Sequence, residues 1–331
     1  GESLPLNDRI TRAKAAEAAA LSYDPRITNS EGAEFASNLY RIIYGNSHGF
    51  LGEYQGSTFS LAVTPIALSD GAMQRDYWYT FSRHLNGLES PEAVGKRAAE
   101  RTIRRLGARK IATREVPVVF DPETSASLMR SLCSAVSGPS LYRGASFLID
   151  RLGDRIAPEI VSIYDDGTLQ GHLGSKPFDG EGLPTRRTAL VENGVLRSYL
   201  LDTYSARKLK LAPTGSAARG VGDVPTVGPT NFFLQAGPDD PTEIIRSVDS
   251  GLYVTELIGP GVNFVTGDYS RGAVGFWIEN GKLTDPVEEI TVAGNLKEML
   301  LGIEMVGNDL TFRSSVVAPT LKIRRMTVAG H

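Results

Sequence analysis

Histidine and cysteine are the side chains in this sequence that most often bind metals or act as nucleophiles. The four histidines, His48, His84, His172 and His331, are isolated, and none has a second histidine four residues away. A catalytic zinc ion needs three protein ligands and an open position for water, and a lone histidine supplies no such geometry. We therefore expect surface or hydrogen-bonded structural roles for all four, and no metal-binding residue in this chain.

The single cysteine and the acidic residues also lack a catalytic context. Cys133 lies in an apolar helical pattern, which predicts a thiol in the core. Asp165-Asp166-Gly167 is typical of a turn, and the adjacent Glu288 and Glu289 point to opposite faces of a strand, so neither pair is suited to acid/base catalysis. Gly220-Val221-Gly222 lacks the third glycine of a dinucleotide loop. We expect no catalytic residue and no cofactor.

The bulk composition indicates a globular protein without a nucleic-acid or membrane partner. The 331 residues are 41% hydrophobic and carry a net charge of -3, with lysine and arginine spread along the chain. Binding to a phosphate backbone needs a basic patch, and a membrane-spanning helix needs about 20 consecutive apolar residues. We find neither, and residues 1–12 lack the apolar core of a signal peptide. A single cysteine fits a reducing compartment, so we expect a cytoplasmic protein.

The N-terminal part of the sequence predicts an antiparallel sheet with flanking helices. Residues 7–21 are rich in alanine with interspersed charges, which favours a helix capped by Asn7 or Asp8. Ser90-Pro91 carries the signals for the start of a second helix. Three strand-like stretches lie between the two helices, at 39–44, 59–63 and 76–81. We place this N-terminal α/β domain at residues 1–115.

The C-terminal part predicts a β-rich domain at residues 116–331. It opens with a buried strand at 116–120, after which Asp121-Pro122 begins a helix. Short strands then alternate with hairpin-turn signals at 165–167, 192–194 and 279–281. The predicted fold class is therefore α+β, with two domains.

Four short motifs are spread over most of the chain. They are residues 26–32, 45–49 and 205–209 and the run Thr266-Gly267-Asp268-Tyr269-Ser270-Arg271-Gly272-Ala273. Together they resemble the TldD/TldE (PmbA) peptidase family, also called the modulator of DNA gyrase family, and within it the TldE/PmbA branch. The resemblance extends over roughly residues 20 to 331.

In the active branch of this family a His-Glu-x-x-x-His motif on a helix and a cysteine near the C-terminus bind the metal. The resemblance matches that motif to residues 134–139, so that Ser134, Ala135 and Pro139 stand in place of the two histidines and the glutamate. The cysteine is matched by Val306. The resemblance therefore implies a chain without catalytic residues, in which the ligands and the general base are all replaced.

The resemblance further implies a heterodimer with a TldD-type sister subunit. The sister would supply the zinc, and this chain, inactive alone, would help to close a chamber for unfolded or short peptides bound by added-strand pairing. The alternative is a homodimeric peptide-binding or regulatory protein that acts without catalysis. A third interpretation is an independent hydrolase with an unrecognised site. Family members carry a further α/β region before the matched part, so we expect this chain to begin inside that region.

One motif supplies the candidates for contact with substrate: Thr266, Gly267, Asp268, Tyr269, Ser270 and Arg271. In one interpretation it is a tight structural turn in which Asp268 pairs with Arg271. In the other it is the wall of a cleft that touches peptide, with Tyr269 and Arg271 as the main contacts. The glycine-rich strand that follows is expected to offer the free sheet edge that strand addition needs.

Overall fold

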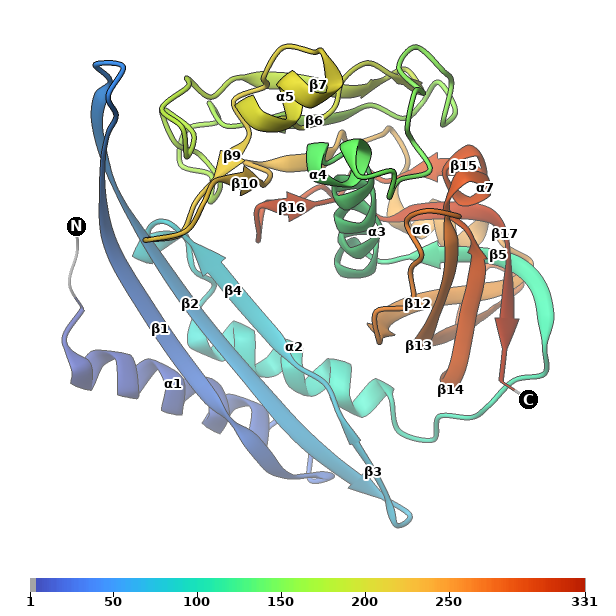
Figure 1. The fold of residues 1–331 in the computed structure, drawn as a ribbon. Helices are drawn as coiled ribbons and strands as arrows, with labels where there is room; N and C mark the ends of the chain where they lie inside the picture. The colour runs from blue at the N-terminus through green and yellow to red at the C-terminus, as the bar shows by residue number, and fades with distance from the viewer. Residues whose placement is uncertain (1–3, 331) are drawn as a thin grey trace. The chain divides into compact units, whose positions relative to one another are not determined.

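The computed structural model describes residues 4–330, and the chain divides into two compact units (Figure 1). Unit 1 comprises Gly1–Ile43 and Glu53–Arg109, and unit 2 comprises Tyr44–Gly52 and Lys110–His331. Helices and strands occur in both units, and strands predominate in unit 2. The predicted α+β class is confirmed.

Unit 1 contains two helices and a four-stranded sheet of order β1-β2-β3, with β4 paired to β2. The elements are α1 (Leu6–Leu21), β1 (Ile27–Gly45), β2 (Leu51–Ser69), β3 (Ala72–Arg75), β4 (Trp78–Ser82), a 3-10 turn (Leu85–Gly87) and α2 (Pro91–Arg104). The predicted cap of α2 is confirmed, since the Ser90 hydroxyl accepts a hydrogen bond from the Ala93 amide. The predicted cap of α1 is wrong, because that helix starts earlier, after Pro5, without a side-chain cap.

The two helices of unit 1 approach each other closely at one glycine. A Cβ atom at Gly95 of α2 would lie 2.2 Å from the Ala16 carbonyl oxygen of α1. Alanines 16, 20, 98 and 99 are fully buried at this crossing. Small side chains therefore let the helix backbones pack tightly, and any larger residue at position 95 would push them apart.

Unit 2 holds a six-stranded sheet, a five-stranded sheet, a short hairpin and five helices among its described residues. Its helices are α3 (Pro122–Ala135), α4 (Gly138–Tyr142), α5 (Thr203–Leu209), α6 (Pro241–Arg246) and α7 (Leu296–Leu301). Its strands are β5 (Arg114–Phe120), β6 (Ile163–Asp166), β7 (Arg187–Glu192), β8 (Val195–Leu196), β9 (Ala217–Ala218), β10 (Thr226–Val227), β11 (Phe232–Leu234), β12 (Ser250–Ile258), β13 (Asp268–Glu279), β14 (Lys282–Asn295), β15 (Ile303–Val306), β16 (Val316–Val317) and β17 (Leu321–Ala329).

The larger sheet of unit 2 closes on itself. Its order is β14-β13-β12-β5-β17-β15, and an additional pairing joins β14 to β17. β5 and β12 run parallel, and the other neighbouring strands run antiparallel. The closure gives a barrel of β5, β12, β13, β14 and β17, in which each of these strands has a neighbour on both sides.

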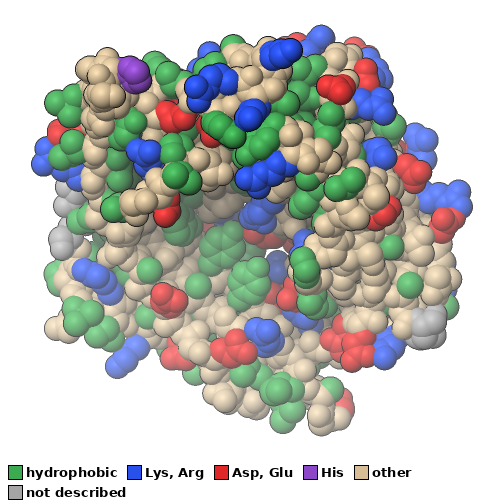
Figure 2. Space-filling view, viewed as in Figure 1, with side chains coloured by type: hydrophobic (Ala, Val, Ile, Leu, Met, Phe, Trp, Pro, Cys, Tyr) green, Lys and Arg blue, Asp and Glu red, His purple; other side chains and the backbone are tan. Residues whose placement is uncertain are grey.

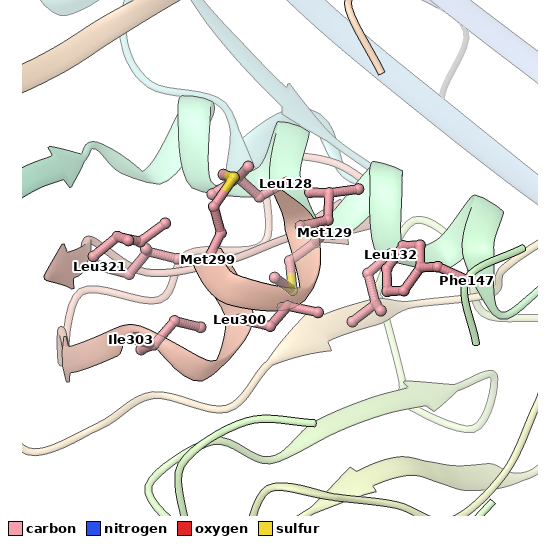
Figure 3. A pocket seen from close by; sticks show the side chains of 10 residues that line it. Leu128, Met129, Leu132, Phe147, Met299, Leu300, Ile303 and Leu321 are labelled. Carbon is pink, nitrogen blue, oxygen red and sulfur yellow. The ribbon is translucent and has the colours of Figure 1, made fainter. Parts of the chain in front are cut away.

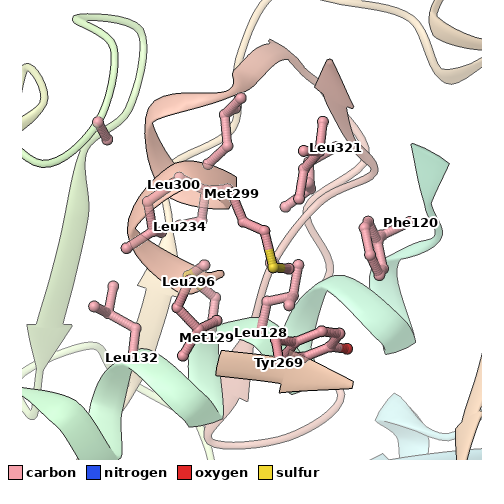
Figure 4. Close-up of a cluster of buried hydrophobic side chains, with 14 of the residues drawn as sticks. Phe120, Leu128, Met129, Leu132, Leu234, Tyr269, Leu296, Met299, Leu300 and Leu321 are labelled. Carbon is pink, nitrogen blue, oxygen red and sulfur yellow. The ribbon is translucent and has the colours of Figure 1, made fainter. Parts of the chain in front are cut away.

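The core of unit 2 lies on both faces of the barrel strand β5. Val118 and Phe120 face the main cluster, which includes α3 and α7, while Val119 faces a smaller cluster beside α6. Figure 4 shows the main cluster, with Met129 and Leu132 of α3 opposite Leu296 and Leu300. Burial on both faces explains why residues 116–120 form a continuous apolar run and were predictable as a buried strand.

Two of the three predicted hairpin turns are confirmed. Asn193-Gly194 joins β7 to β8, and Asn280-Gly281 joins β13 to β14, with positive φ at all four residues. The turn predicted at 165–167 is wrong: β6 ends at Asp166, and its antiparallel partner β7 begins only at Arg187. The reason is that both aspartates of this stretch are buried and organise loops instead of a tight turn.

The surface gives no sign of a single-sign charge patch on the face that Figure 2 shows. Basic and acidic side chains are interspersed there with hydrophobic and neutral ones. Within residues 4–330, no helix is both long and apolar enough to cross a membrane.

Candidate functional site

The stretch matched to the metal-binding motif does not lie on one helix. Ser134 belongs to the last turn of α3, which ends at Ala135, and Pro139 lies in the first turn of α4. The Ser134 hydroxyl donates to the Arg130 carbonyl, and Ala135 is fully buried. The break at residues 136–137 separates the two positions that the motif would need on a common face.

Val306 lies on a different element, at the end of β15. It pairs with Leu321 of β17 and is fully buried. A Cβ atom at Gly237 would lie 2.2 Å from its carbonyl oxygen, so the backbone of a neighbouring loop packs directly against it. The side chain is a hydrocarbon in a packed core, with no room for a ligand atom or an ion.

These positions do not fit a zinc ion. Zinc is bound by nitrogen, sulfur or carboxylate oxygen atoms, and the side chains of Ala135, Pro139 and Val306 offer none. Among residues 4–330, no three histidine, cysteine, aspartate or glutamate side chains gather in a way that could hold a metal ion. The Nδ1 atom of His172 donates to the Gln170 carbonyl oxygen over 3.0 Å, and the ring packs against Phe312, while His331 lies outside the described residues.

The candidate stretch 266–271 begins as a turn fixed by side-chain hydrogen bonds. The Thr266 hydroxyl donates to Asp268 over 2.6 Å, and the Asn295 amide donates to both the Thr266 carbonyl and Asp268. These hydrogen bonds lower the pKa of Asp268. Gly267 has φ +89°, and a Cβ atom there would lie 2.8 Å from the Asn295 side chain, so the position requires glycine.

The predicted pairing of Asp268 with Arg271 does not form. Asp268 bonds to Thr266 and Asn295, whereas Arg271 donates to the Ser127 hydroxyl of α3 over 2.5 Å and to the Leu257 carbonyl over 3.2 Å. On a strand these two side chains point to opposite faces, because their positions differ by an odd number, three. Arg271 therefore ties β13 to α3 and β12 rather than closing the turn.

Burial separates the candidates into two groups. Thr266, Asp268 and Ser270 are exposed. Tyr269 is 2% exposed, and its ring lies beside Leu128 in the core (Figure 4). Burial raises the pKa of Tyr269 to about 12. A peptide at this stretch would contact the exposed Thr266, Asp268 and Ser270, whereas the Tyr269 ring is buried beneath them.

The free sheet edge expected on this strand is absent. β13 pairs with β14 from Asp268 to Glu279 and with β12 from Gly272 onward, and Ser270 donates its amide hydrogen to the Gly261 carbonyl over 2.7 Å. Both sides of the strand are thus occupied, because β13 lies between β12 and β14 in the sheet. Strands that do lie at the ends of their sheets include β1 of unit 1 and β8, β15 and β16 of unit 2.

Two buried polar atoms near this stretch form no hydrogen bond of ordinary geometry, the Tyr269 hydroxyl and the Arg271 Nε, although the neighbouring Arg271 guanidinium acts to lower the pKa of Tyr269. We expect Tyr269→Phe to leave the free energy of unfolding unchanged or to raise it by up to about 1 kcal/mol, because removing an unsatisfied buried hydroxyl costs nothing. Denaturant unfolding measures this effect. The matched control is Tyr199→Phe, whose hydroxyl donates to the Leu148 carbonyl over 2.6 Å, and which should lose about 1 kcal/mol or more. Equal losses in both variants would show that Tyr269 has a partner.

The stretch Gly45-Asn46-Ser47-His48-Gly49 has the Gly-x-Ser-x-Gly pattern of a nucleophile elbow. In a nucleophile elbow the serine stands between a strand and a helix. Here the stretch is the turn between β1 and β2, in which the Asn46 side chain accepts hydrogen bonds from the His48 and Phe50 amides. The local geometry is that of an Asx-stabilised turn.

Buried ionisable groups form a cluster that the sequence did not reveal. Asp165 is 2% exposed and accepts hydrogen bonds from the Thr230 amide, over 2.7 Å, and the Thr230 hydroxyl, over 2.9 Å. Burial raises the pKa of Asp165 to about 6 and lowers the pKa of the nearby Lys176. Burial, with the charge of Asp165, also raises the pKa of Cys133 to about 12. Cys133 therefore stays protonated at neutral pH and is no nucleophile.

The cavity between α3 and α7 is too small for a ligand. Its side chains are all hydrocarbon or thioether, among them Leu128, Met129, Met299 and Leu300 (Figure 3). Its volume is about 10 Å³, at the lower limit of what one ordered water needs. It is a packing defect in the core and holds no functional group.

Two family models together match nearly the whole chain. Residues 1–106 match the PmbA/TldA metallopeptidase central domain, and residues 113–330 match the C-terminal domain. The chain belongs to the PmbA/TldD family of metallopeptidases. Its resemblance to that family, drawn above from short motifs, is thereby confirmed.

Relatives within the PmbA/TldD family cover almost all of the chain. It is 43% identical to metalloprotease PmbA of Escherichia coli O157:H7 over 98% of its own length and 70% of that protein. A homologue from Haemophilus influenzae is 41% identical over 96% of the chain and 68% of that protein. A TldD homologue from Buchnera aphidicola is 27% identical over 79% of the chain and 58% of that protein.

Solved structures share the fold. A proposed modulator of DNA gyrase from Thermotoga maritima superposes with a TM-score of 0.92 at 31% identity, covering 98% of this chain and 75% of that one. One from Bacteroides thetaiotaomicron has a TM-score of 0.91 at 33% identity, covering 99% and 72%. TldE from Thermococcus kodakarensis has a TM-score of 0.90 at 24% identity, covering 99% and 75%. The arrangement of helices and strands described above is that of the PmbA/TldD family.

Proposed function

We propose that this chain is the noncatalytic subunit of a TldD/TldE-type metallopeptidase complex that degrades or matures unfolded peptides in the cytoplasm. The observation that carries the proposal is the chemistry at the positions matched to the metal site. Ala135 and Val306 are fully buried hydrocarbons there, and Pro139 has no ligand atom. In the proposal these apolar side chains replace the metal site of the active branch.

The chemistry of peptide hydrolysis determines which groups each subunit would supply. A bound zinc ion generates the nucleophile by lowering the pKa of its water, and it needs three protein ligands for this. In the proposal a TldD-type sister supplies the ligands, the zinc and the general base. This chain contributes a wall of the substrate chamber, for which Thr266, Asp268 and Ser270 are the exposed candidates.

The test measures zinc content and cleavage of an unfolded casein substrate for this chain alone, the TldD-type sister alone, and their mixture. We expect this chain to be free of stoichiometric zinc and inert, and the mixture to cleave. A matched control replaces the glutamate of the sister's His-Glu-x-x-x-His motif by glutamine, which should abolish cleavage by the mixture. Zinc at one ion per chain, together with cleavage by this chain alone, would overturn the proposal.

The same experiment addresses the alternative of a homodimeric peptide-binding or regulatory protein. This alternative is motivated by the solved structures described as proposed modulators of DNA gyrase, a description that names regulation and no peptidase activity. It predicts a stable homodimer that binds extended peptide and does not activate the sister. Size-exclusion chromatography with light scattering, run on the same samples, distinguishes a homodimer from a heterodimer.

A further inference from the structure

A pocket with an apolar floor lies beside α7 in unit 2. Phe147, Leu148, Ile156 and Leu300 form the floor, and the pocket encloses about 170 Å³. Pockets that hold a whole small molecule usually exceed about 300 Å³. This one is the size for a single large aliphatic or aromatic side chain.

The rim of the pocket carries more positive than negative charge. Arg151, Arg155 and Lys297 line it together with one acid, Asp154. Arg151 pairs with Asp154 over 3.0 Å, so these two charges offset each other. Arg155 donates to the Asn193 carbonyl, a neutral group that leaves its charge uncompensated, and Lys297 interacts with the charge of Asp268 outside the pocket. Two cations therefore stand over an apolar floor.

Main-chain hydrogen bonds hold the walls of the pocket in place. The Phe147 amide donates to the Phe264 carbonyl over 2.8 Å, and the Leu148 carbonyl accepts from the Tyr199 hydroxyl over 2.6 Å. The Ile156 amide donates to the Gly194 carbonyl over 2.8 Å. A pocket whose walls are already ordered loses little entropy when it binds a ligand.

The pocket adjoins the exposed candidate stretch. Phe264, which bonds to the pocket wall at Phe147, lies two residues before Thr266. On the other side Lys297 lies close enough to Asp268 to act on its charge. A chain running along Thr266 and Ser270 would thus reach the pocket with its end.

We propose that this pocket binds the C-terminal residue of an extended peptide, with a large apolar side chain on the floor and the α-carboxylate between Arg155 and Lys297. The proposal rests on the proposed function, since it assigns the peptide's end to this subunit. A single carboxylate suits two separated cations, whereas Asp154 at the rim and Asp268 near Lys297 would repel a polyanion such as a nucleic acid.

The test is calorimetric binding of hexapeptides to the isolated full chain. Three peptides differ only at their end: leucine with a free carboxylate, leucine with a C-terminal amide, and aspartate with a free carboxylate. We expect the first to bind about tenfold more tightly than either of the others, because each of the others lacks one of the two recognised groups.

Charge variants show where the peptide binds. Lys297→Glu should weaken binding of the leucine acid by about fivefold or more and leave the amide nearly unchanged. The matched control is Lys282→Glu at the β13–β14 turn, which makes the same charge change outside the pocket and should bind as the parent chain does. Thermal unfolding of both variants checks that they remain folded.

Three outcomes would overturn the pocket assignment. They are equal binding of acid and amide, equal effects of the two lysine variants, and binding of decanoate without binding of any of the peptides, which would point to a lipid-like carboxylate. None of these depends on a sister subunit or on zinc. The proposed function as a noncatalytic subunit is tested separately, by the cleavage experiment with the sister subunit.

Discussion

Asp165→Asn is expected to raise the free energy of unfolding at pH 8 by up to about 3 kcal/mol. The carboxylate is buried, and its pKa is raised from 3.8 to about 6, a difference that corresponds to roughly 3 kcal/mol. Because the folded state holds the proton more tightly, stability should fall as the pH rises from about 4 to about 6 and remain lower above that. Asparagine carries no charge, so its stability should lack this fall.

The geometry around Asp165 allows this replacement. Asparagine can still accept from the Thr230 amide, and its own amide can donate to the Thr230 hydroxyl, which reverses direction. The other charged or titratable groups near Asp165 are Lys176, Asp166 and Cys133. Lys176 loses a favourable neighbour in the variant, and for that reason the gain is an upper limit.

The control for this prediction is Asp179→Asn. Asp179 is also buried, but it accepts only from main-chain amides, those of Glu181 and Leu183 at one oxygen and that of Ala217 at the other. An asparagine amide group must face one of these donors, so this variant should lose about 1 to 3 kcal/mol. Urea unfolding at pH 5 and pH 8 measures both. A loss in Asp165→Asn at pH 8 as large as that in Asp179→Asn would contradict the expectation.

Gly261→Ala is expected to destabilise the protein by about 3 kcal/mol or more. A Cβ atom at this position would lie 1.7 Å from the Ser270 carbonyl oxygen, and the residue has φ +40°. The clash and the left-handed backbone each cost roughly 1 to 3 kcal/mol. The substitution also strains the hydrogen bond from the Ser270 amide to the Gly261 carbonyl, which holds the exposed candidate stretch.

Gly259→Ala separates the two causes. Gly259 has φ +79° as well, but nothing lies within 4 Å of a Cβ atom there. Gly259→Ala should therefore lower the free energy of unfolding only through the unfavourable backbone conformation, by about 1 to 2 kcal/mol. Denaturant unfolding followed by tryptophan fluorescence measures both variants, because Trp277 lies in the same barrel. Similar losses in the two variants would mean that the loop at Gly261 moves freely away from β13.

Local signals in the sequence predicted local structure well. The cap at Ser90, the start of α3 after Asp121 and the turns at Asn193-Gly194 and Asn280-Gly281 depend on a few adjacent residues, and the structure confirms them. The TldE-like motifs identified the family for the same reason: they are short, contiguous and chemically distinctive.

The failures concern contacts between residues far apart in the sequence. The sequence assigns Asp165 to a turn, because no adjacent residue indicates that Thr230 is its hydrogen-bond partner. One interpretation pairs Arg271 with Asp268, whereas its partner Ser127 lies on α3, far away in the sequence. The sequence predicts a free edge on β13, but the strand has β14 on one side and, on the other, β12, which pairs with it from Gly272 onward. The pocket at Phe147 was missed because its floor comes from two separate segments of the chain.

The closure of the barrel has a consequence for synthesis on the ribosome. β5 is made early in unit 2, but one of its two neighbours is β17, the last strand of the described chain. Until β17 emerges, β5 and β14 each present an unpaired row of main-chain donors and acceptors, which is the kind of edge that promotes association between chains. Unit 2 is therefore a candidate for chaperone protection during translation, and slow folding is expected from pairing so distant in sequence.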